Sequence, residues 1–471
     1  MELYKQVARD MAVAIEAGIY SAGEKLPGVR ALSVSQQVSP ATAVAAYRQL
    51  ERDGYVEARP RSGYYAIGRP VLVAEPEPAA TELCKPRLIA SQQRVLQLVS
   101  DIHDTAVVRL GAAVADPSYL PGRTLERALA KALREQRGAA LNYAPLQGFL
   151  GLRTQLSKRL WQLGCPAKPE DILITNGCQE AVCLALRALL APGDTVAVET
   201  PAFHGHLHMI EALGFKVLEI PCHPRTGISL DALRLALEQW PIKACLMVPN
   251  YSNPLGSCMS DADKRALVEL CRARGAVVIE DDIYGDLCFD ERRPSPVARF
   301  DGDGSVVYCS SFSKTLAPGL RIGWVYSPRY IEPLKYQKFV NNVAVSSLAQ
   351  LALAEYLQTA HFDQHLRTFR RQLATCMQRV AEAVATEFPS GTKMTRPSGG
   401  YLLWVELPGA IDALQLAELC ALERIHIAPG PMFAATERYA NCLRLSCAVV
   451  WNDKTRHALR RVGQLAAQLR A

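Results

Sequence analysis

Residues that could carry chemistry follow each of five strand-like apolar runs in this 471-residue chain. In chain order they are Gly177 with Cys178, Phe203, Asn253, Asp281 with Tyr284, and Ser311 with Lys314 and Arg321. In open sheets with parallel strands, ligands bind beyond the carboxyl ends of the strands. We therefore expect these side chains to converge at one edge of a sheet.

The residue types suit one kind of ligand. A lysine can form a Schiff base with an aldehyde, and a carboxylate can pair with a protonated pyridine nitrogen and sustain an electron sink. Ser, Arg and a helix amino terminus hold phosphate. An aromatic ring can stack on a planar heterocycle, and Asn and Tyr can bond a phenolic oxygen. Pyridoxal 5′-phosphate (PLP) needs this set.

The elements that must position these residues alternate along the body of the chain. The strand-like runs are Ile172–Thr175, Thr195–Val198, Ala244–Val248, Ala276–Ile279 and Val306–Tyr308. Helical segments such as Gln179–Leu190 and Asp261–Arg274 lie between them. This alternation predicts an α/β fold whose sheet is mostly parallel, with helices on both faces.

A proline-rich stretch over 69–86 predicts an extended linker, 69–105, between a head, 1–68, and the body, 106–471. In the head, Leu3, Val7, Met11 and Ile15 mark one helical face. A second short helix follows Gly28. Ser39-Pro40 opens a third helix, and two strand-like runs joined by a basic turn complete the head. Three helices followed by a two-stranded wing form a DNA-binding layout. The candidate DNA contacts are Arg30, Thr42, Arg48 and Arg61.

Several motifs of the head resemble the winged helix-turn-helix of GntR-type transcription regulators. They are Leu26-Pro-Gly-Val-Arg30-Ala-Leu, Val38-Ser-x-x-Thr42 and Ala46-Tyr-Arg-Gln-Leu-Glu-Arg-Asp-Gly-Tyr55. The body resembles fold-type I PLP enzymes of the aspartate-aminotransferase superfamily, which have a large and a small subdomain. The combination of such a head and body resembles the MocR subfamily of GntR regulators.

The resemblance implies a role for each residue around the cofactor ring. Lys314 would carry the cofactor as an internal aldimine, and Asp281 would face the pyridine nitrogen. Asn253 and Tyr284 would bond the 3-oxygen of the ring, and Phe203 would stack on it.

It also implies contacts to the phosphate and to a ligand. The phosphate would be held by Gly177, Cys178, Ser311 and Arg321. For Cys178 the alternative is that its backbone N–H serves the phosphate while its thiol only packs. Tyr143 would reach the phosphate of the partner subunit, or pack at that interface. Arg444 would clamp the α-carboxylate of a substrate or effector, with a surface salt bridge as the alternative.

Two further features bear on ligands. His204, His206 and His208 would share one face of a strand and could suggest a metal site, but a helix is expected there, and we expect no metal. In the third helix, Ala41 and Ala45 stand where the family usually offers basic or amide residues. Base-specific hydrogen bonds from this helix should therefore be few, and readout should rely on methyl contacts, phosphates and shape.

Composition narrows the class of protein. The formal net charge of +7 is modest and by itself supports no nucleic-acid claim. The 14 cysteines include no Cys-x-x-Cys pair, so they suggest reduced thiols in a cytosol. No apolar run is long enough for a membrane span. We expect a cytoplasmic protein without membrane contacts.

Two functions follow from these expectations. The first is a homodimeric, PLP-dependent transcriptional regulator that binds a double-stranded DNA operator and senses PLP, an amino acid or an amine. The second is a working PLP-dependent aminotransferase with a regulatory DNA-binding head, because Lys314, Asp281 and Tyr284 are all retained as catalytic candidates.

Overall fold

The computed structural model describes residues 3–17, 19–21, 23–59, 62–67, 73–78, 83, 85–88, 107–290, 292–409, 411–436 and 438–470. It forms two compact units, which are described separately: Met1–Val73 with Gln378–Thr386, and Ala74–Met377 with Glu387–Ala471. Most of the predicted linker lies outside the described residues, and so does Arg61. The boundaries 1–68, 69–105 and 106–471 remain a prediction.

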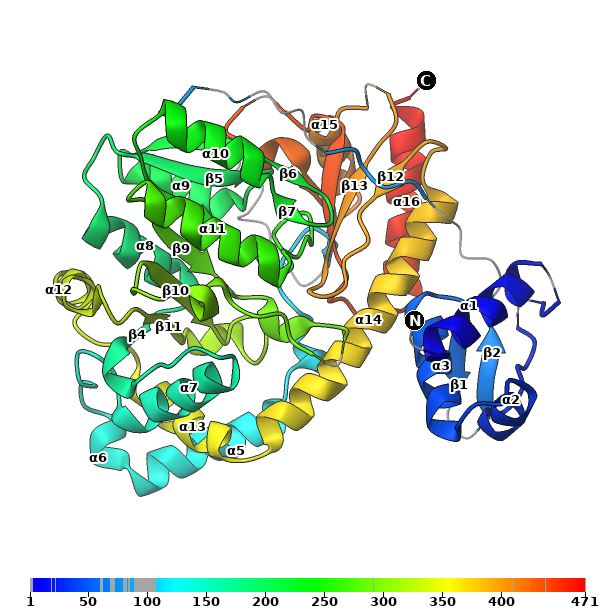
Figure 1. Ribbon diagram of the computed structural model, residues 1–471, viewed down its shortest axis with the longest axis horizontal. Coiled ribbons are helices and arrows are strands. Elements are labelled where there is room, and N and C mark those ends of the chain that lie inside the picture. Colours follow the sequence, from blue (N-terminus) through cyan, green and yellow to red (C-terminus); the bar gives the residue numbers. More distant parts are fainter. Residues whose placement is uncertain are drawn as a thin grey trace. The chain divides into compact units, whose positions relative to one another are not determined.

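The first unit contains the predicted three helices and a two-stranded wing (Figure 1). They are α1 (Leu3–Glu16), α2 (Val29–Ser35), α3 (Pro40–Arg52), β1 (Val56–Arg59) and β2 (Gly63–Ala66), the two strands being antiparallel. The Ser39 hydroxyl accepts a hydrogen bond from the Thr42 amide at 3.1 Å, and Pro40 takes the first helical position, so α3 begins as predicted. Tyr47 is fully buried and stacks on Tyr64 in the small core.

The second unit is built on an eight-stranded sheet in the order β4-β11-β10-β9-β8-β5-β6-β7. The bounds are β4 (Ile172–Thr175), β5 (Thr195–Thr200), β6 (Lys216–His223), β7 (Gly227–Ile228), β8 (Ile242–Met247), β9 (Val277–Asp281), β10 (Val306–Ser311) and β11 (Gly323–Tyr326). Strands β5, β6, β8, β9 and β10 are parallel, whereas β11 runs antiparallel to β10 and β4. The sheet is therefore mostly parallel, and its central strands are buried on both faces, as such sheets require.

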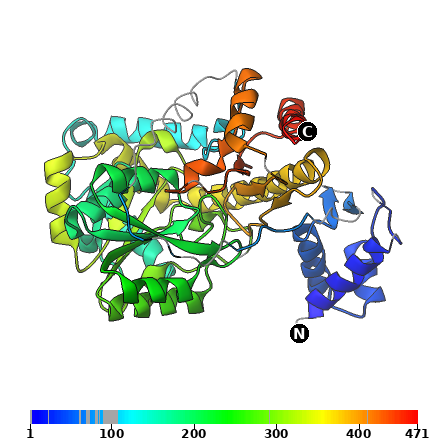
Figure 2. The same ribbon diagram turned by 90° about the horizontal axis from the view of Figure 1, so that it is seen from above.

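Helices cover both faces of this sheet (Figures 1 and 2). Their bounds are α5 (Gly122–Glu135), α6 (Arg137–Ala140), α7 (Leu150–Gln162), α8 (Cys178–Leu189), α9 (His204–Ala212), α10 (Leu230–Gln239), α11 (Asp261–Ala273), α12 (Ile331–Asn341), α13 (Ser347–Gln358) and α14 (His361–Glu387). Short 3₁₀ helices are η2 (Pro117–Tyr119), η3 (Pro169–Asp171), η4 (Gly285–Leu287), η5 (Val297–Phe300), η6 (Pro318–Leu320) and η7 (Gly430–Phe433).

A smaller layer completes the unit with a four-stranded sheet in the order β12-β13-β16-β15. Its elements are β12 (Lys393–Met394), β13 (Leu402–Glu406), α15 (Ala413–Leu422), β15 (Ala428–Pro429), β16 (Cys442–Ser446) and α16 (Asp453–Gln468). Beside it, β3 (Val108–Arg109) pairs with β14 (Ile425–His426). A Cβ at Gly111 would lie 2.4 Å from the Ile427 carbonyl carbon, so glycine permits this close approach. This approach places the segment around Gly111, near the start of the body, against the segment around Ile427, near its end.

No helix in the described part of the chain is both long and apolar enough to cross a membrane.

Candidate functional site

The carboxyl ends of the parallel strands gather the predicted residues at one edge of the large sheet. Strand β9 ends at Asp281 and β10 at Ser311, and the two strands are hydrogen-bonded neighbours. Lys314 follows the end of β10 by three residues, and helix α8 likewise begins three residues after the end of β4. The order of the strands therefore accounts for the convergence that the sequence predicts.

Asp281 is buried and is held by two side chains from other elements. His206 Nε2 lies 3.1 Å from Asp281 Oδ2, and the Cys178 thiol donates to Asp281 Oδ1 at 3.1 Å. Burial and the nearby Asp281 raise the pKa of Cys178 well above its usual range, so this thiol stays protonated and can donate. The Cys178 side chain thus fixes the carboxylate, in addition to its place at the start of α8.

This role of His206 was not predicted from the sequence, where the three histidines were considered only as possible metal ligands. In α9 the His206 ring faces Asp281, whereas burial lowers the pKa of His204 to about 3, so that ring is neutral. The described residues include no group of three His, Cys, Asp or Glu side chains arranged for a metal ion. The signal in the sequence was the helical spacing: in α9, His206 lies on a different face from His204 and His208, and it is His206 that contacts Asp281.

Lys314 is half-buried in the second unit. Its Nζ donates to the carbonyl oxygen of Ala113 at 2.5 Å. Burial, reinforced by the charge of Arg444 and partly opposed by Asp281, lowers the pKa of Lys314 to about 8. An appreciable fraction of this amine is therefore neutral near physiological pH, which is the form that attacks an aldehyde.

This lowered pKa predicts how fast the apoprotein takes up pyridoxal 5′-phosphate as pH changes. The neutral fraction of Lys314 should grow about tenfold per pH unit below its pKa and level off above it. Uptake, followed by absorbance in stopped flow, should rise up to about pH 8 and then flatten. A rise that continues toward pH 10 would show an ordinary lysine and contradict the assignment.

Arg444 and Asn253 form the wall of the site opposite the strand ends. Arg444 is buried on β16; its Nη1 donates to Asn253 Oδ1 at 2.8 Å and its Nη2 to the Gly111 carbonyl. Its Nε is buried without any partner among the described residues. A guanidinium has five N–H groups, so Arg444 keeps donors for a further ligand. The Asn253 amide, with its oxygen toward Arg444, keeps its NH₂ group to donate to a ring oxygen.

Tyr284 is 2% exposed and lies 5.5 Å from the ring of Tyr401 in an edge-to-face contact. Burial raises the pKa of Tyr284, although the charge of Arg444 opposes this. The phenol is therefore protonated and can donate a hydrogen bond. Phe203 caps α9, and a Cβ at Gly205 would lie 2.5 Å from its ring. Glycine at 205 thus leaves room for the aromatic side chain.

A cradle for an anion lies where α8 begins. Gly177 is the N-cap of α8 with φ +83°, and a Cβ there would lie 2.6 Å from Arg321 Nη2. The free N–H groups of the first turn favour a phosphate. Arg321 Nη2 donates to the Asn176 carbonyl at 2.9 Å, and its Nη1 lies 3.4 Å from Ser313 Oγ. This backbone conformation leaves no space for a side chain between the helix start and the guanidinium.

The serines beside this cradle have unequal surroundings. Ser311 is buried, and its Oγ accepts a hydrogen bond from the Ser313 amide at 3.2 Å. Ser313, which sequence reasoning did not select, has its hydroxyl next to Arg321. The spacing Ser-x-Ser-Lys was the available signal, since both hydroxyls precede Lys314 in one turn.

Tyr143 lies apart from these residues. It is 83% exposed, in the segment between α6 and α7, and its side chain makes no hydrogen bond within the described part of the chain. It does not join the site of its own chain. This placement is compatible with the expectation that it reaches a partner subunit.

The DNA candidates lie on the surface of the first unit. Arg30 is exposed in the first turn of α2, and Arg48 is exposed on α3. Thr42 is half-buried, and its hydroxyl lies 2.8 Å from that of Ser39, so it takes part in the helix cap. Ala41 is exposed on α3, as the sequence predicts.

The second unit fits pyridoxal 5′-phosphate by its own chemistry. It offers an amine at Lys314, a fixed carboxylate at Asp281 and a helix start beside a guanidinium at Gly177. The partnerless Nε of Arg444 adds a buried donor. These are the aldehyde, pyridine and phosphate partners that the cofactor requires.

Comparison with known proteins agrees with this arrangement. Residues 108–462 match the family "Aminotransferase class I and II", and residues 3–65 match "Bacterial regulatory proteins, gntR family". The match to the aminotransferase family, together with structural neighbours of PLP enzymes, makes pyridoxal 5′-phosphate the cofactor of the body.

Relatives and solved structures cover both parts. The uncharacterized HTH-type transcriptional regulators YjiR and YdcR of Escherichia coli K12 are 38% and 35% identical, over 98% and 99% of both chains. The α-aminoadipate aminotransferase LysN of Thermus thermophilus, solved with N-(5′-phosphopyridoxyl)-L-leucine, is 30% identical with a TM-score of 0.74, covering 81% of this chain and 96% of that one. The chain therefore belongs to the GntR family of HTH-type transcriptional regulators whose body is an aminotransferase class I and II domain, the MocR type.

Proposed function

We propose that this regulator senses an amino acid at the site between Lys314 and Arg444. One observation carries the proposal: a reactive amine and a buried cation with free donors face the same space, close enough for the charge of Arg444 to lower the pKa of Lys314. An α-amino acid has a primary amine and a carboxylate at matching ends. Its amine would combine with the cofactor aldehyde that Lys314 holds, and its carboxylate would pair with Arg444.

When bound, pyridoxal 5′-phosphate supplies an aldehyde that combines with primary amines and a ring that accepts electron density. Lys314 holds or releases a proton at Nζ, and its pKa of about 8 suits both roles. Asp281, fixed by His206 and Cys178, would offer its carboxylate to the pyridine nitrogen of the cofactor. Arg444 orients a carboxylate, and the loss of its solvent shell strengthens that contact.

The head would convert ligand binding into a change at DNA. We assign residues 1–68 to DNA binding, 69–105 to a linker that transmits the change, and 106–471 to sensing. Ligand binding shifts the equilibrium between body conformations, and two linked heads then grip or release two half-sites. We place this function in the cytoplasm, where the operator is.

Single arginines of the head test the DNA interface. Arg30→Ala and Arg61→Ala should each weaken operator binding and lower the slope of log affinity against log salt by about one, because each removes one phosphate contact. Fluorescence anisotropy over a salt series measures this slope. Arg9→Ala on α1 is the matched control, since it removes the same charge elsewhere in the head. An unchanged slope removes the residue from the phosphate contacts.

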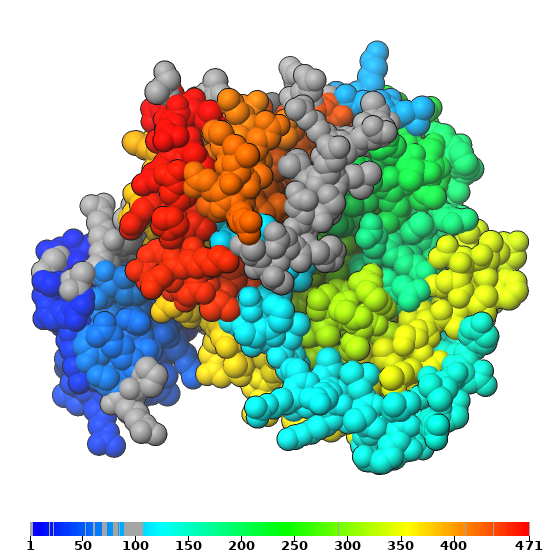
Figure 3. Space-filling view, turned by 180° about the vertical axis from the view of Figure 1, so that it is seen from behind, coloured from blue at the N-terminus to red at the C-terminus, as the bar shows by residue number. Residues whose placement is uncertain are grey.

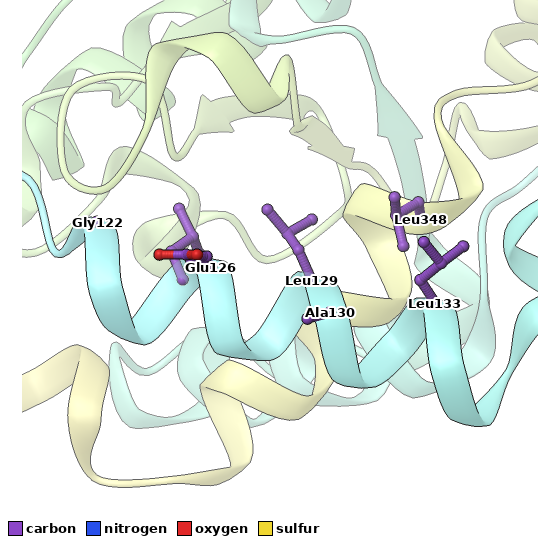
Figure 4. A pocket seen from close by; sticks show the side chains of 7 residues that line it. Gly122, Glu126, Leu129, Ala130, Leu133 and Leu348 are labelled. Carbon is purple, nitrogen blue, oxygen red and sulfur yellow. The ribbon is translucent and has the colours of Figure 1, made fainter.

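We propose a homodimer, with a second copy of the chain covering an apolar groove of the body. The groove runs along α5, with Leu129 and Leu133 beside Leu348 of α13 (Figure 4). Helices α5 and α6 form part of the surface in Figure 3. The exposed Tyr143 follows α6, so one covering chain would meet both features. Sedimentation should give twice the mass of one chain, and the mass of a single chain would refute the dimer.

A working aminotransferase is the second candidate. The observation in its favour is that Lys314 has a lowered pKa and Tyr284 a raised one, while Asp281 is held in place by His206 and Cys178. A steady-state assay with an amino donor and 2-oxoglutarate separates the two functions. Many turnovers per chain would establish the enzyme. A single spectral change without keto-acid product would favour the sensor.

A further inference from the structure

The second unit contains another cavity, of about 350 Å³, that shares no residue with the cofactor site. Leu156 and Arg159 of α7 and Arg367 and Arg370 of α14 line it, together with Tyr308 of β10 and Trp324 of β11. Helices α7 and α14 are labelled in Figure 1. Consecutive side chains of a strand point to opposite faces. Tyr308 therefore lines this cavity, while Cys309 packs in the core with α8.

Two of the four arginines of the cavity are neutralised by carboxylates. Arg159 Nη1 lies 3.1 Å from Asp363 Oδ1. Arg293 is nearly buried between Asp282 and Asp286, with 2.6 Å from its Nε to Asp286 Oδ1. The positive charges of Arg159 and Arg293 are therefore balanced by these aspartates.

The other two arginines have no such partner at salt-bridge distance, although the charge of Arg370 helps to lower the pKa of Asp286, which also lines the cavity. Arg367 and Arg370 are three residues apart on α14, so they lie on one face of the helix. Neither forms an ion pair with a carboxylate within the described residues, and Arg370 Nε donates only to the main-chain oxygen of Asp286 at 2.6 Å. The rim of the cavity therefore carries two cations with unfilled N–H donors.

Trp324 supplies an independent observation. Its side chain lines the cavity and is 8% exposed, yet its Nε1–H has no acceptor among the described residues. A buried donor without a partner is costly to the fold, and such groups are usually satisfied by an ordered molecule. The Trp324 side chain therefore gives a spectroscopic signal from the wall of this cavity.

The remaining wall defines the rest of the ligand. Leu156, Leu160, Leu163 and Phe312 make one side of the cavity apolar. An inorganic anion would leave that wall uncovered, whereas an acid with an apolar body would fill it. We propose that this cavity binds a small carboxylic acid with an apolar body, its carboxylate accepting from Arg367 and Arg370 of α14 and its apolar body packing on the leucines and Phe312.

This second site is independent of the amino-acid site at Lys314, because the ligand needs no amine and meets no cofactor. The probe is 3-phenylpropionate, which has a carboxylate and an apolar ring but no amino group. The amide 3-phenylpropionamide has the same body without the charge, and inorganic phosphate has the charge without the body.

The indole ¹⁵N–¹H signal of Trp324 in the holoprotein reports binding at this site. The chain has five tryptophans, so five indole signals are expected, and Trp324→Phe assigns the one in question. We expect 3-phenylpropionate to shift the Trp324 signal with saturation, because the ligand fills the cavity that this side chain lines. The doubly substituted Arg367→Gln, Arg370→Gln protein should bind about tenfold more weakly or worse. Arg371→Gln, which removes the neighbouring arginine on α14 outside the cavity, should bind as the wild type does.

The outcomes separate the possibilities. A Trp324 signal that never moves overturns the site, and so does equal binding by the arginine-substituted protein and the wild type. If 3-phenylpropionamide binds as tightly as 3-phenylpropionate, the site does not recognise a carboxylate. If phosphate binds saturably and 3-phenylpropionate does not, the site does not require an apolar body. Thermal unfolding and cofactor absorbance show that each variant is folded. Probe bound at Arg444 would instead persist in the variants of α14 and leave the Trp324 signal unmoved.

Discussion

Replacing Lys314 by alanine is expected to abolish covalent attachment of pyridoxal 5′-phosphate and the visible absorption that accompanies it. Lys314 is the amine beside Asp281, Cys178 and Arg444, all of which influence its pKa. Absorbance of the purified protein, and mass spectrometry after borohydride reduction, measure the attachment. A reduced adduct on another lysine of the Lys314→Ala protein would show that the assignment is wrong.

A second buried lysine provides the control. Lys338 is also buried, its Nζ donates to the Leu146 carbonyl, and burial lowers its pKa to about 8. Lys338→Met should keep the cofactor band. Comparing Lys314→Ala with Lys338→Met therefore tests whether the position of the lysine in the site, and not only its lowered pKa, determines where the cofactor is attached.

Replacing Arg444 by glutamine is expected to lower the affinity for amino acids far more than the affinity for amines that lack a carboxylate. Loss of a charge-assisted contact in a buried site is worth about 2–3 kcal/mol, which is about 30- to 150-fold in affinity. Glutamine ends two bonds short of the Nη1 atom that contacts Asn253, so this contact is lost as well, and a ligand without a carboxylate is needed as the control. Spectral titration with phenylalanine and with phenethylamine, which lacks the carboxylate, gives the two affinities.

The comparison of the two ligands makes the result specific. If Arg444 binds the carboxylate, the affinity for phenethylamine should stay within a few-fold of the wild type. Equal loss for both ligands would mean that Arg444 only supports Asn253 and the main chain at Gly111. A direct carboxylate contact would then be excluded.

Much of the site could be predicted from the sequence because its residues lie at or just after the ends of strands. Asp281, Ser311 and Lys314 each follow an apolar run, and neighbouring parallel strands bring such residues to one edge. The predicted α/β class and the three helices and wing of the head agree with the structure for the same local reasons: periodicity, caps and turns. The antiparallel strand β11 is a departure that no local pattern announced.

Contacts between distant segments could not be derived in this way. Arg444 sits inside strand β16 of the small sheet, and only the family resemblance singled it out. His206 and Asp281 are 75 residues apart, so their hydrogen bond depends on how α9 packs on the sheet. The cavity beside Trp324 likewise needs α7, β11 and α14 together, which no spacing along the chain expresses.

The most direct test of a PLP-dependent regulator is operator binding by the holoprotein during titration with an amino acid, with the cofactor spectrum recorded in the same samples. We predict that one amino acid changes the spectrum and the affinity for DNA over the same concentration range, and that Lys314→Ala loses both responses while still binding DNA. Operator affinity that stays constant while the spectrum changes fully would contradict the coupling of the body to the head.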